Sequence, residues 1–389
     1  MKCKRLMSLK QGIQAETERL GFLLSGAATV SQPPHFDTYA RWVAQGLHAN
    51  MSYLAAERAF ERRKDPHLIL PEARSLLAVA LRYPNPNAAP PADPNDASGR
   101  VAAYAWGRDY HDVIPPLLEE LIRAIEAMLG QPVRSRSYTD TGPILERDFG
   151  QRAGLGWAGK NTCLISPRHG SYFLLGETLL DVAIEPDPPM VTDHCGTCRR
   201  CIEACPTSCI REDRTIDSGR CISYLTIENK GPIPIELRPH LGEWIFGCDI
   251  CQMVCPWNLR FADAKGRFTT PDGHPALAPR PENARPILRQ ALRLAPQEFN
   301  QKFKGSPILR AKRRGYLRNA AVALGNAQDT AAIPDLAQTL TKEPEPLVRA
   351  HAAWALGRMK HVRARQALDK ALAQETDPAV LAEIRQAGA

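Results

Sequence analysis

Cysteines occur at two places in the chain with the spacing of metal or cluster ligands. The first run, CGTCRRCIEACP, begins at Cys195 and follows C-x2-C-x2-C-x3-C-P, and the second, CDICQMVCP, begins at Cys248 and follows C-x2-C-x3-C-P. Such clustering among 11 cysteines favours ligation over a disulfide framework. Zinc is the alternative for a C-x2-C pair, but the repeated C-x3-C-P favours 4Fe–4S clusters, which transfer electrons.

The spacing also predicts which cysteines share a cluster. In a two-cluster run the first three cysteines hold one cubane and the fourth reaches the other. A complete second run would have its leading cysteine at Ile245, so cluster two lacks a ligand, and Cys221 is predicted to supply it. Cys209 is predicted to be a small buried residue instead. The expected ligands are Cys195, Cys198, Cys201 and Cys255 for cluster one, and Cys205, Cys221, Cys248 and Cys251 for cluster two.

The elements that must position these ligands fall into three segments. Residues 1–190 mix helical and strand-like periodicity, which predicts an α/β domain. Helices are expected within 9–60, at 112–130 and from about 142, and strands at 75–83, 134–140 and 171–184. Residues 191–265 contain the eight cysteines and are predicted to form a ferredoxin-like two-cluster domain.

The third segment, residues 285–389, contains an internal repeat. Residues 317–340 align with residues 349–372, and both copies contain Ala-Leu-Gly at the same place. This periodicity predicts HEAT-like helix pairs, which makes the whole chain a mixed α+β protein with a helical C-terminal part. Two repeats cannot bury their apolar faces alone, so we expect them to pack on the rest of the molecule.

A basic run precedes the repeats. The net charge of the chain is +8, and QKFKGSPILRAKRRGYLRN (301–319) has seven cationic residues, two aromatic residues and no acid. Cations neutralise phosphates and aromatic rings stack on unpaired bases, so the run predicts RNA binding, with a solvated helix face as the alternative. These residues are Lys302, Lys304, Arg310, Lys312, Arg313, Arg314 and Arg318, with Phe303 and Tyr316.

Several stretches outside the cysteine runs match one family in the same order. They are YAWGRDYHD (104–112), YTDTGPILERDFGQRAGLGWAGKN (138–161), HGSYFLLGE (169–177) and RCISYLTIENKG (220–231). With the cysteines and the two repeats, they make the chain resemble epoxyqueuosine reductases over nearly its full length. The resemblance implies an oxidoreductase of queuosine biosynthesis that uses cobalamin and two 4Fe–4S clusters. It would remove the epoxide oxygen of epoxyqueuosine at the tRNA wobble position.

The resemblance also implies a separate binding function for each of the three segments. Residues 1–190 would bind cobalamin and substrate, residues 191–265 the clusters, and residues 285–389 the tRNA. The partners would be the tRNA anticodon stem-loop and an external electron donor. The sequence lacks the D-x-H-x-x-G cobalamin motif, because DPHLIL (65–70) has no glycine at the required place. The corrin would therefore be bound without that histidine arrangement.

By position, the resemblance places the proton donor at Asp140. Opening an epoxide expels an alkoxide, which leaves readily only when an acid protonates it, and burial beside a corrin would keep a carboxyl protonated. The alternative is that Asp140 caps the helix after TDTG. The positions expected to line the cobalamin are Asp140 together with Arg63, Ala102, Leu164, Leu175, Ser223 and Asp249.

Two other functions fit part of the sequence. One is a cobalamin and iron–sulfur reductase of another small molecule, and the other is an electron-transfer protein fused to a repeat scaffold. The first leaves the basic run unexplained, and the second leaves residues 1–190 without a role. No stretch approaches the roughly 20 apolar residues that cross a bilayer, and no secretory signal is recognisable, so we expect a cytoplasmic monomer.

Overall fold

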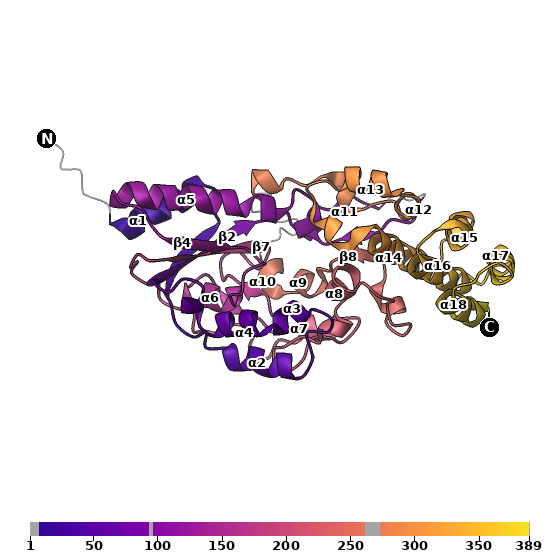
Figure 1. Cartoon of the computed structure of the whole chain (residues 1–389), viewed down its shortest axis with the longest axis horizontal. Coiled ribbons are helices and arrows are strands. Elements are labelled where there is room, and N and C mark those ends of the chain that lie inside the picture. Colours follow the sequence, from indigo (N-terminus) through magenta and orange to yellow (C-terminus); the bar gives the residue numbers. More distant parts are fainter. Residues whose placement is uncertain (1–7, 93–95, 261–272, 389) are drawn as a thin grey trace.

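The computed structural model describes residues 8–92, 96–260 and 273–388. The molecule is elongated, with a β-sheet and its covering helices at one end and the C-terminal helices at the other (Figure 1). The short helices that carry the cysteines lie between these two ends. The mixed fold predicted from the sequence is confirmed. The predicted end of the cysteine segment, residues 261–265, lies outside the described residues.

The main sheet has four antiparallel strands in the order β1-β2-β7-β4. The prediction of helices throughout 9–60 is wrong at β1, which is an edge strand. Gly26 in β1 permits close packing, because a Cβ there would lie 2.1 Å from the backbone oxygen of Ala153. The strands are β1 (Leu24–Thr29), β2 (Ser75–Arg82), β4 (Ser135–Tyr138) and β7 (Phe173–Leu180).

Helices cover both faces of this sheet. α1 (Leu9–Arg19) and α5 (Ile114–Leu129) pack together on one face, and α6 (Glu146–Arg152) lies on the other (Figure 1). α5 has proline in its first turn and ends at Gly130, whose φ of 68° suits glycine, as the sequence predicted. The helices on the side of α6 also include α2 (Phe36–Ala44), α3 (Ser52–Ala55) and α4 (Glu57–Lys64).

The cysteine segment folds into short helices. α7 packs against α9, which brings the two cysteine runs side by side. The parallel strands β3 (Arg100–Val101) and β8 (Trp244–Phe246) join the N-terminal segment to this one, while β5 (Trp157–Ala158) and β6 (Leu164–Ile165) form a small hairpin. The helices are α7 (Arg200–Glu203), α8 (Ile222–Ile227), α9 (Ile250–Met253) and α10 (Pro256–Leu259).

The repeat predicted from the sequence corresponds to the helix pairs α14–α15 and α16–α17. It packs on the rest of the molecule, as expected: Arg238 forms a buried ion pair with Glu383 at 2.7 Å, and the backbone N–H of Ile233 donates to Nε2 of His351. The C-terminal helices are α11 (Pro281–Ala284), α12 (Leu288–Leu292), α13 (Pro296–Lys302), α14 (Lys312–Ala327), α15 (Ile333–Lys342), α16 (Pro346–Arg358), α17 (Val362–Leu372) and α18 (Pro378–Gly388).

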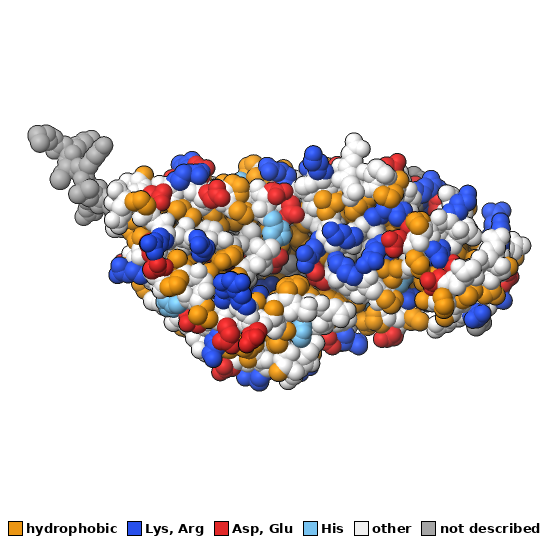
Figure 2. Space-filling model, in the orientation of Figure 1, with side chains coloured by type: hydrophobic (Ala, Val, Ile, Leu, Met, Phe, Trp, Pro, Cys, Tyr) orange, Lys and Arg blue, Asp and Glu red, His pale blue; other side chains and the backbone are white. Residues whose placement is uncertain are grey.

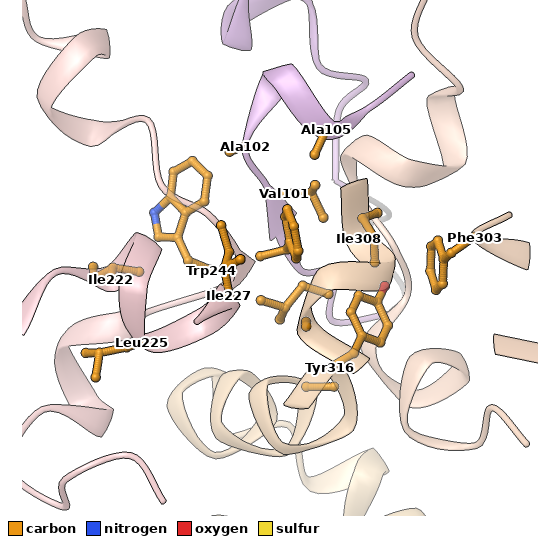
Figure 3. Close-up of a cluster of buried hydrophobic side chains, with 14 of the residues drawn as sticks. Val101, Ala102, Ala105, Ile222, Leu225, Ile227, Trp244, Phe303, Ile308 and Tyr316 are labelled. Atoms are coloured by element: carbon orange, nitrogen blue, oxygen red, sulfur yellow. The ribbon is translucent and has the colours of Figure 1, made fainter. Parts of the chain in front are cut away.

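One hydrophobic core runs through all three segments. It includes residues from Ile13 in α1 to Ile384 in α18. Figure 3 shows part of it, where Val101 of the N-terminal segment, Trp244 of the cysteine segment and Tyr316 of α14 lie close together. The segments that differ in sequence character are therefore not separately packed bodies.

Candidate iron–sulfur centre and active site

Four thiols from both cysteine runs line one cavity. Its volume is about 260 Å³, and Cys255 of the second run faces it together with three cysteines of the first run, Cys195, Cys198 and Cys201. Two side chains support the cavity wall: the indole Nε1 of Trp157 lies 3.5 Å from Sγ of Cys195, and Nζ of Lys160 donates to the backbone oxygens of Gly196 and Cys198 at 2.7 and 2.9 Å. The thiols brought together are those predicted for cluster one.

The other four predicted ligands form a second, deeper group. Burial raises the pKa of Cys248 well above its usual value, and the nearby thiols of Cys221 and Cys205 raise it further. The thiol of Cys251 donates a hydrogen bond to Cys163, and this bond, followed by burial, raises the pKa of Cys251, to which the charges of Cys163, Cys248 and Cys221 also contribute. These mutual effects place Cys205, Cys221, Cys248 and Cys251 near one another.

Two further sulfurs lie beside this second group, Cys163 next to Cys251 and Cys209 next to Cys205. Cys209 is buried, as predicted, but its Sγ is 3.4 Å from that of Cys205. Hydrogen bonds to Cys205 and Cys221 raise the pKa of Cys209, whereas the hydrogen bond from Cys209 lowers the pKa of Cys221. Cys209 is thus the hydrogen-bond donor to Cys221.

This donor set fits cubane clusters better than zinc. Among the described residues, no three Cys, His, Asp or Glu side chains converge closely enough to hold a single metal ion. Zinc needs four ligands around one ion, with thiolates at about 2.3 Å. A cubane takes one thiolate at each of its four irons, so its ligands lie further apart. Two groups of four thiols around two centres match that requirement.

Asp140 lies in the loop between β4 and α6. Its Oδ2 accepts a hydrogen bond from the hydroxyl of Tyr110 at 2.9 Å and lies 3.8 Å from Nε2 of His111. The side chain of Asp140 is 66% exposed. The capping alternative is wrong, because α6 starts at Glu146, its N-cap is Leu145, and no side chain caps it.

Tyr110 and His111 extend this site, although neither was among the predicted site residues. A hydrogen bond from Nδ1 of His111 to Asp109 at 2.7 Å raises the pKa of the imidazole, and the charge of Asp140 raises it further. Burial raises the pKa of Tyr110, so its hydroxyl stays a donor to Asp140. Both residues lie in the YAWGRDYHD stretch, which was the sequence signal for them.

Contacts join Asp140 to the cysteines. Oδ2 of Asp249, between the ligands Cys248 and Cys251, accepts the backbone N–H of Ala103 at 2.8 Å. The ring of Tyr104, the next residue, packs edge-on against Tyr110 at 6.1 Å between centroids, and Tyr110 reaches Asp140. Burial raises the pKa of Asp249 to about 7. Asp249, predicted to line the cobalamin, therefore lies on the same path as Asp140, and Ala102, also predicted to line it, directly precedes Ala103 on this path.

Of the other predicted cobalamin positions, some lie next to the Asp140 loop and one has no described contact with it. Leu164 and Leu175 both pack beside Gly150, and the backbone oxygen of Leu175 accepts the hydroxyl of Thr139, next to Asp140, at 2.7 Å. Ser223 lies in α8, two residues after Cys221. Arg63 is buried over the ring of Tyr39, 5.6 Å from its centroid, and none of its described contacts connects it to Asp140.

Half of the basic run points inward, which corrects its interpretation as a continuous RNA-binding face. Phe303 and Tyr316 are each 1% exposed and pack on each other, with centroids 5.0 Å apart (Figure 3). Arg318 is fully buried and donates to the backbone oxygens of Leu225, Asn229 and Gly231. Arg313 forms a two-pronged ion pair with Glu343. These four side chains stabilise the fold and cannot contact RNA.

The remaining cations of the run are exposed. Figure 2 shows lysine and arginine side chains gathered on the face near α14. Arg310 pairs with Glu228 at 2.8 Å, and this hydrogen bond raises its pKa, with smaller contributions from Tyr53 and Asp140. The exposed part of the run thus reaches the surroundings of Asp140. The exposed cations are Lys302, Lys304, Arg310, Lys312 and Arg314.

Family models match three parts of the chain. A 4Fe-4S double cluster binding domain matches residues 194–258, the model described as epoxyqueuosine reductase QueG, DUF1730, matches residues 63–141, and HEAT repeats match residues 307–388. The first match assigns the cysteine segment to two 4Fe–4S clusters. Within the described residues, no helix is both long and apolar enough to span a membrane.

Whole-chain relatives agree with these matches. The epoxyqueuosine reductase of Pseudomonas aeruginosa is 38% identical over 90% of this chain and 94% of its own length. A crystal structure of selenomethionine-labelled epoxyqueuosine reductase superposes with a TM-score of 0.88 at 33% identity, and it covers 98% of both chains. A crystal structure of epoxyqueuosine reductase with an epoxyqueuosine-modified tRNA-Tyr stem loop superposes with a TM-score of 0.87, with the same identity and coverage. The chain belongs to the epoxyqueuosine reductase family.

Proposed function

We propose that this protein removes the epoxide oxygen of epoxyqueuosine at the wobble position of tRNA, which yields queuosine. Two electrons and two protons enter, and the oxygen leaves as water. Family membership supports this reaction. The observation that carries the proposal is the path of contacts from Asp249, between two cysteines of the second group, to the carboxylate of Asp140.

The ligands follow from the two groups of thiols. Cluster one is held by Cys195, Cys198, Cys201 and Cys255, and cluster two by Cys205, Cys221, Cys248 and Cys251. An external donor reduces the clusters, and cluster one is the entry point, because its loop includes exposed residues such as Thr197 and Arg200.

Cobalamin would be held by residues between cluster two and Asp140. Buried polar groups are directed there from both sides: the carboxylate of Asp249, and Nε2 of His111, which is buried without a hydrogen-bond partner among the described residues. When bound, cobalamin supplies the reducing centre for the substrate. The residues that would hold it are Ala102, Leu164, Leu175, Ser223 and Asp249, with Asp140 on the substrate side; Arg63 would act through Tyr39.

Asp140 is the proton donor in this proposal. A carboxylic acid that protonates the departing oxygen lowers the barrier to opening the epoxide. The hydroxyl of Tyr110 holds the carboxyl in place, and His111 lies close enough to return a proton after each turnover. The protein alone leaves this side chain exposed, so we expect the bound substrate and cobalamin to bury it and keep it protonated.

The tRNA contacts belong to the C-terminal part. Residues 285–389 bind the anticodon stem-loop through the exposed cations of the basic run, with Arg310 nearest to Asp140. Residues 1–190 bind cobalamin and the modified base, and residues 191–265 bind the clusters. The protein acts as a cytoplasmic monomer.

The replacement Asp140→Asn tests the proton donor. Asn keeps the shape of the side chain and can still accept the hydrogen bond from Tyr110, but it cannot supply a proton. The variant should bind both clusters, cobalamin and tRNA normally. Its rate of conversion of epoxyqueuosine to queuosine, measured in a single turnover under strong reductant, should fall by about 10²–10⁴-fold.

The matched control is Asp112→Asn, which changes an exposed acid in the neighbouring loop and should leave the rate unchanged. A rate for Asp140→Asn within a few-fold of the wild type would remove Asp140 from the mechanism and make His111 the first alternative. If the wild type itself formed no queuosine with cobalamin and reductant present, the proposed reaction would be wrong.

A further inference from the structure

A buried acid lies on the apolar face of the sheet, behind the Asp140 loop. Glu177 in β7 alternates with Leu175 and Leu179, so its side chain points to the same face as theirs. It is 0% exposed, and neither of its carboxyl oxygens makes a well-formed hydrogen bond within the described part of the chain. An acid in such a place carries a large desolvation cost unless it keeps its proton.

The neighbours of Glu177 do not supply a compensating charge pair. The carboxyl of Glu146 at the start of α6 acts on it most strongly among ionisable groups, followed by Asp140, and the cation Arg147 has a smaller, opposing effect. The adjoining strands present Ala78 in β2 and Tyr138 in β4 opposite Glu177. Burial and then the charge of Glu146 raise the pKa of Glu177 well above its usual value. Two carboxyl groups in this environment cannot both ionise.

The second carboxyl of the pair contacts the loop of the proposed acid. Glu146 accepts a hydrogen bond from the backbone N–H of Asp140. Asp140 has a φ of 59°, a left-handed conformation that is less favourable for a residue with a side chain than for glycine. An ionised acceptor makes a stronger hydrogen bond to an amide than a neutral one does. The charge state of Glu146 therefore affects how firmly the loop is held.

We propose that Glu146 and Glu177 share one proton and act together as positioning residues for Asp140. Glu177 carries the proton and donates it toward Glu146, and the Glu146 carboxylate holds the backbone of Asp140 in its left-handed conformation. Loss of the shared proton at higher pH places two negative charges in the pair and releases the loop. The catalytic meaning of this arrangement rests on the proposed function, whereas the pairing itself does not.

Hydrogen exchange of the Asp140 amide tests the pairing without any turnover. The cluster-loaded protein is exchanged over a pH series, and the peptide that contains Asp140 is followed relative to its intrinsic exchange rate. The wild type should protect this amide near neutral pH and lose protection as the pH rises. Glu177→Gln keeps a donor toward Glu146 but cannot ionise, so its protection should persist to higher pH. Glu177→Leu removes the donor and should reduce protection at every pH.

Infrared spectroscopy gives a second readout. The wild type should show the carbonyl stretch of protonated carboxylic acids at a pH where exposed glutamates are ionised, and Glu177→Gln should lose the part of that band that Glu177 contributes, while buried Asp249 keeps its own. The control Glu119→Gln, on the exposed side of α5, should keep both the band and the amide protection. A carbonyl band of unchanged intensity in Glu177→Gln, or identical exchange in the Gln and Leu variants, would overturn the proposal.

Single-turnover rates then test whether the Glu146–Glu177 pair positions Asp140 for catalysis. Because small displacements of a catalytic group cost up to about 10²-fold in rate, Glu177→Leu should lower the single-turnover rate roughly 10- to 100-fold at unchanged tRNA affinity, and Glu177→Gln should restore most of it. If exchange and infrared results hold while Asp140→Asn stays active, the pair positions the loop but Asp140 is not the acid. If Glu177→Leu turns over normally although its loop is released, the positioning role is wrong.

Discussion

The cysteine runs and the basic run look equally regular in the sequence. In the structure, however, the cysteines lie close to one another, whereas the residues of the basic run are divided between the interior and the surface. Four of the eight cysteines predicted as ligands line one cavity, and the other four influence one another's pKa values, while their assignment to two clusters stays a prediction. In the basic run, Arg313, Arg318, Phe303 and Tyr316 turn into the protein, and only the other five cations stay at the surface.

The two runs differ because the spacing of cysteine ligands restricts their positions in space, whereas the spacing of cations does not. Cysteine ligands must converge on one small body, so the distance between them along the chain already restricts their positions in space. A run of cations carries no such restriction, because a helix distributes its residues around all sides. α14 begins with Lys312, Arg313 and Arg314, and its second turn brings Arg318 into the core. Charge counting is therefore weaker than ligand spacing as a guide to function.

Replacing Cys221 should have the largest effect and would test the convergence of the ligands. Cys221→Ala should remove cluster two and about half of the roughly eight irons per chain, because the cluster loses one of its four predicted thiolates. Iron and sulfide analysis with electron paramagnetic resonance of the reduced protein measures this loss. Cys209→Ala is the control and should keep both clusters. Full iron in Cys221→Ala with a cluster missing in Cys209→Ala would reverse the assignment.

Arg318→Ala should have the next largest effect, on stability. Its guanidinium donates to three backbone oxygens, and their loss leaves buried acceptors unsatisfied. We expect the free energy of unfolding to fall by about 3–5 kcal/mol, measured by denaturant unfolding of the cluster-loaded protein. Arg314→Ala, four residues earlier and exposed, should change stability by less than about 0.5 kcal/mol. Equal stability of the two variants would mean that Arg318 is not a structural residue.

The smallest expected effect concerns RNA binding. Lys312→Ala together with Arg314→Ala removes two exposed cations, so the log–log salt dependence of tRNA binding should become shallower by about 0.7–0.9 for each phosphate that the protein no longer neutralises. Cluster content and stability should stay normal. Binding titrations at several salt concentrations measure the slope. An unchanged slope would make the exposed half of the run a solvated surface as well.

The sequence predicted the two-cluster segment, most of the secondary structure and the place of the repeats, because each depends on local spacing or periodicity. β1 was missed, since LSGAAT is short and lacks the β-branched pattern of a strand. The position of Tyr110 beside Asp140 depends on tertiary contacts between distant loops, which no local pattern contains. In the sequence, Glu177 is only an acidic residue within the apolar stretch FLLGETLL. Its complete burial could be recognised only from the position of β7 inside the structure.

The buried Arg318 has a consequence for how the protein is made. α8 follows directly on Cys221, and its last-turn oxygens at Leu225 and Thr226 receive their hydrogen bonds from Arg318 and Asn319, more than ninety residues later in the chain. During synthesis on the ribosome, this helix emerges long before its partners do. We therefore expect the iron–sulfur assembly machinery to fill the Cys221 site only after α14 has left the ribosome, so that a truncated nascent chain never acquires both clusters.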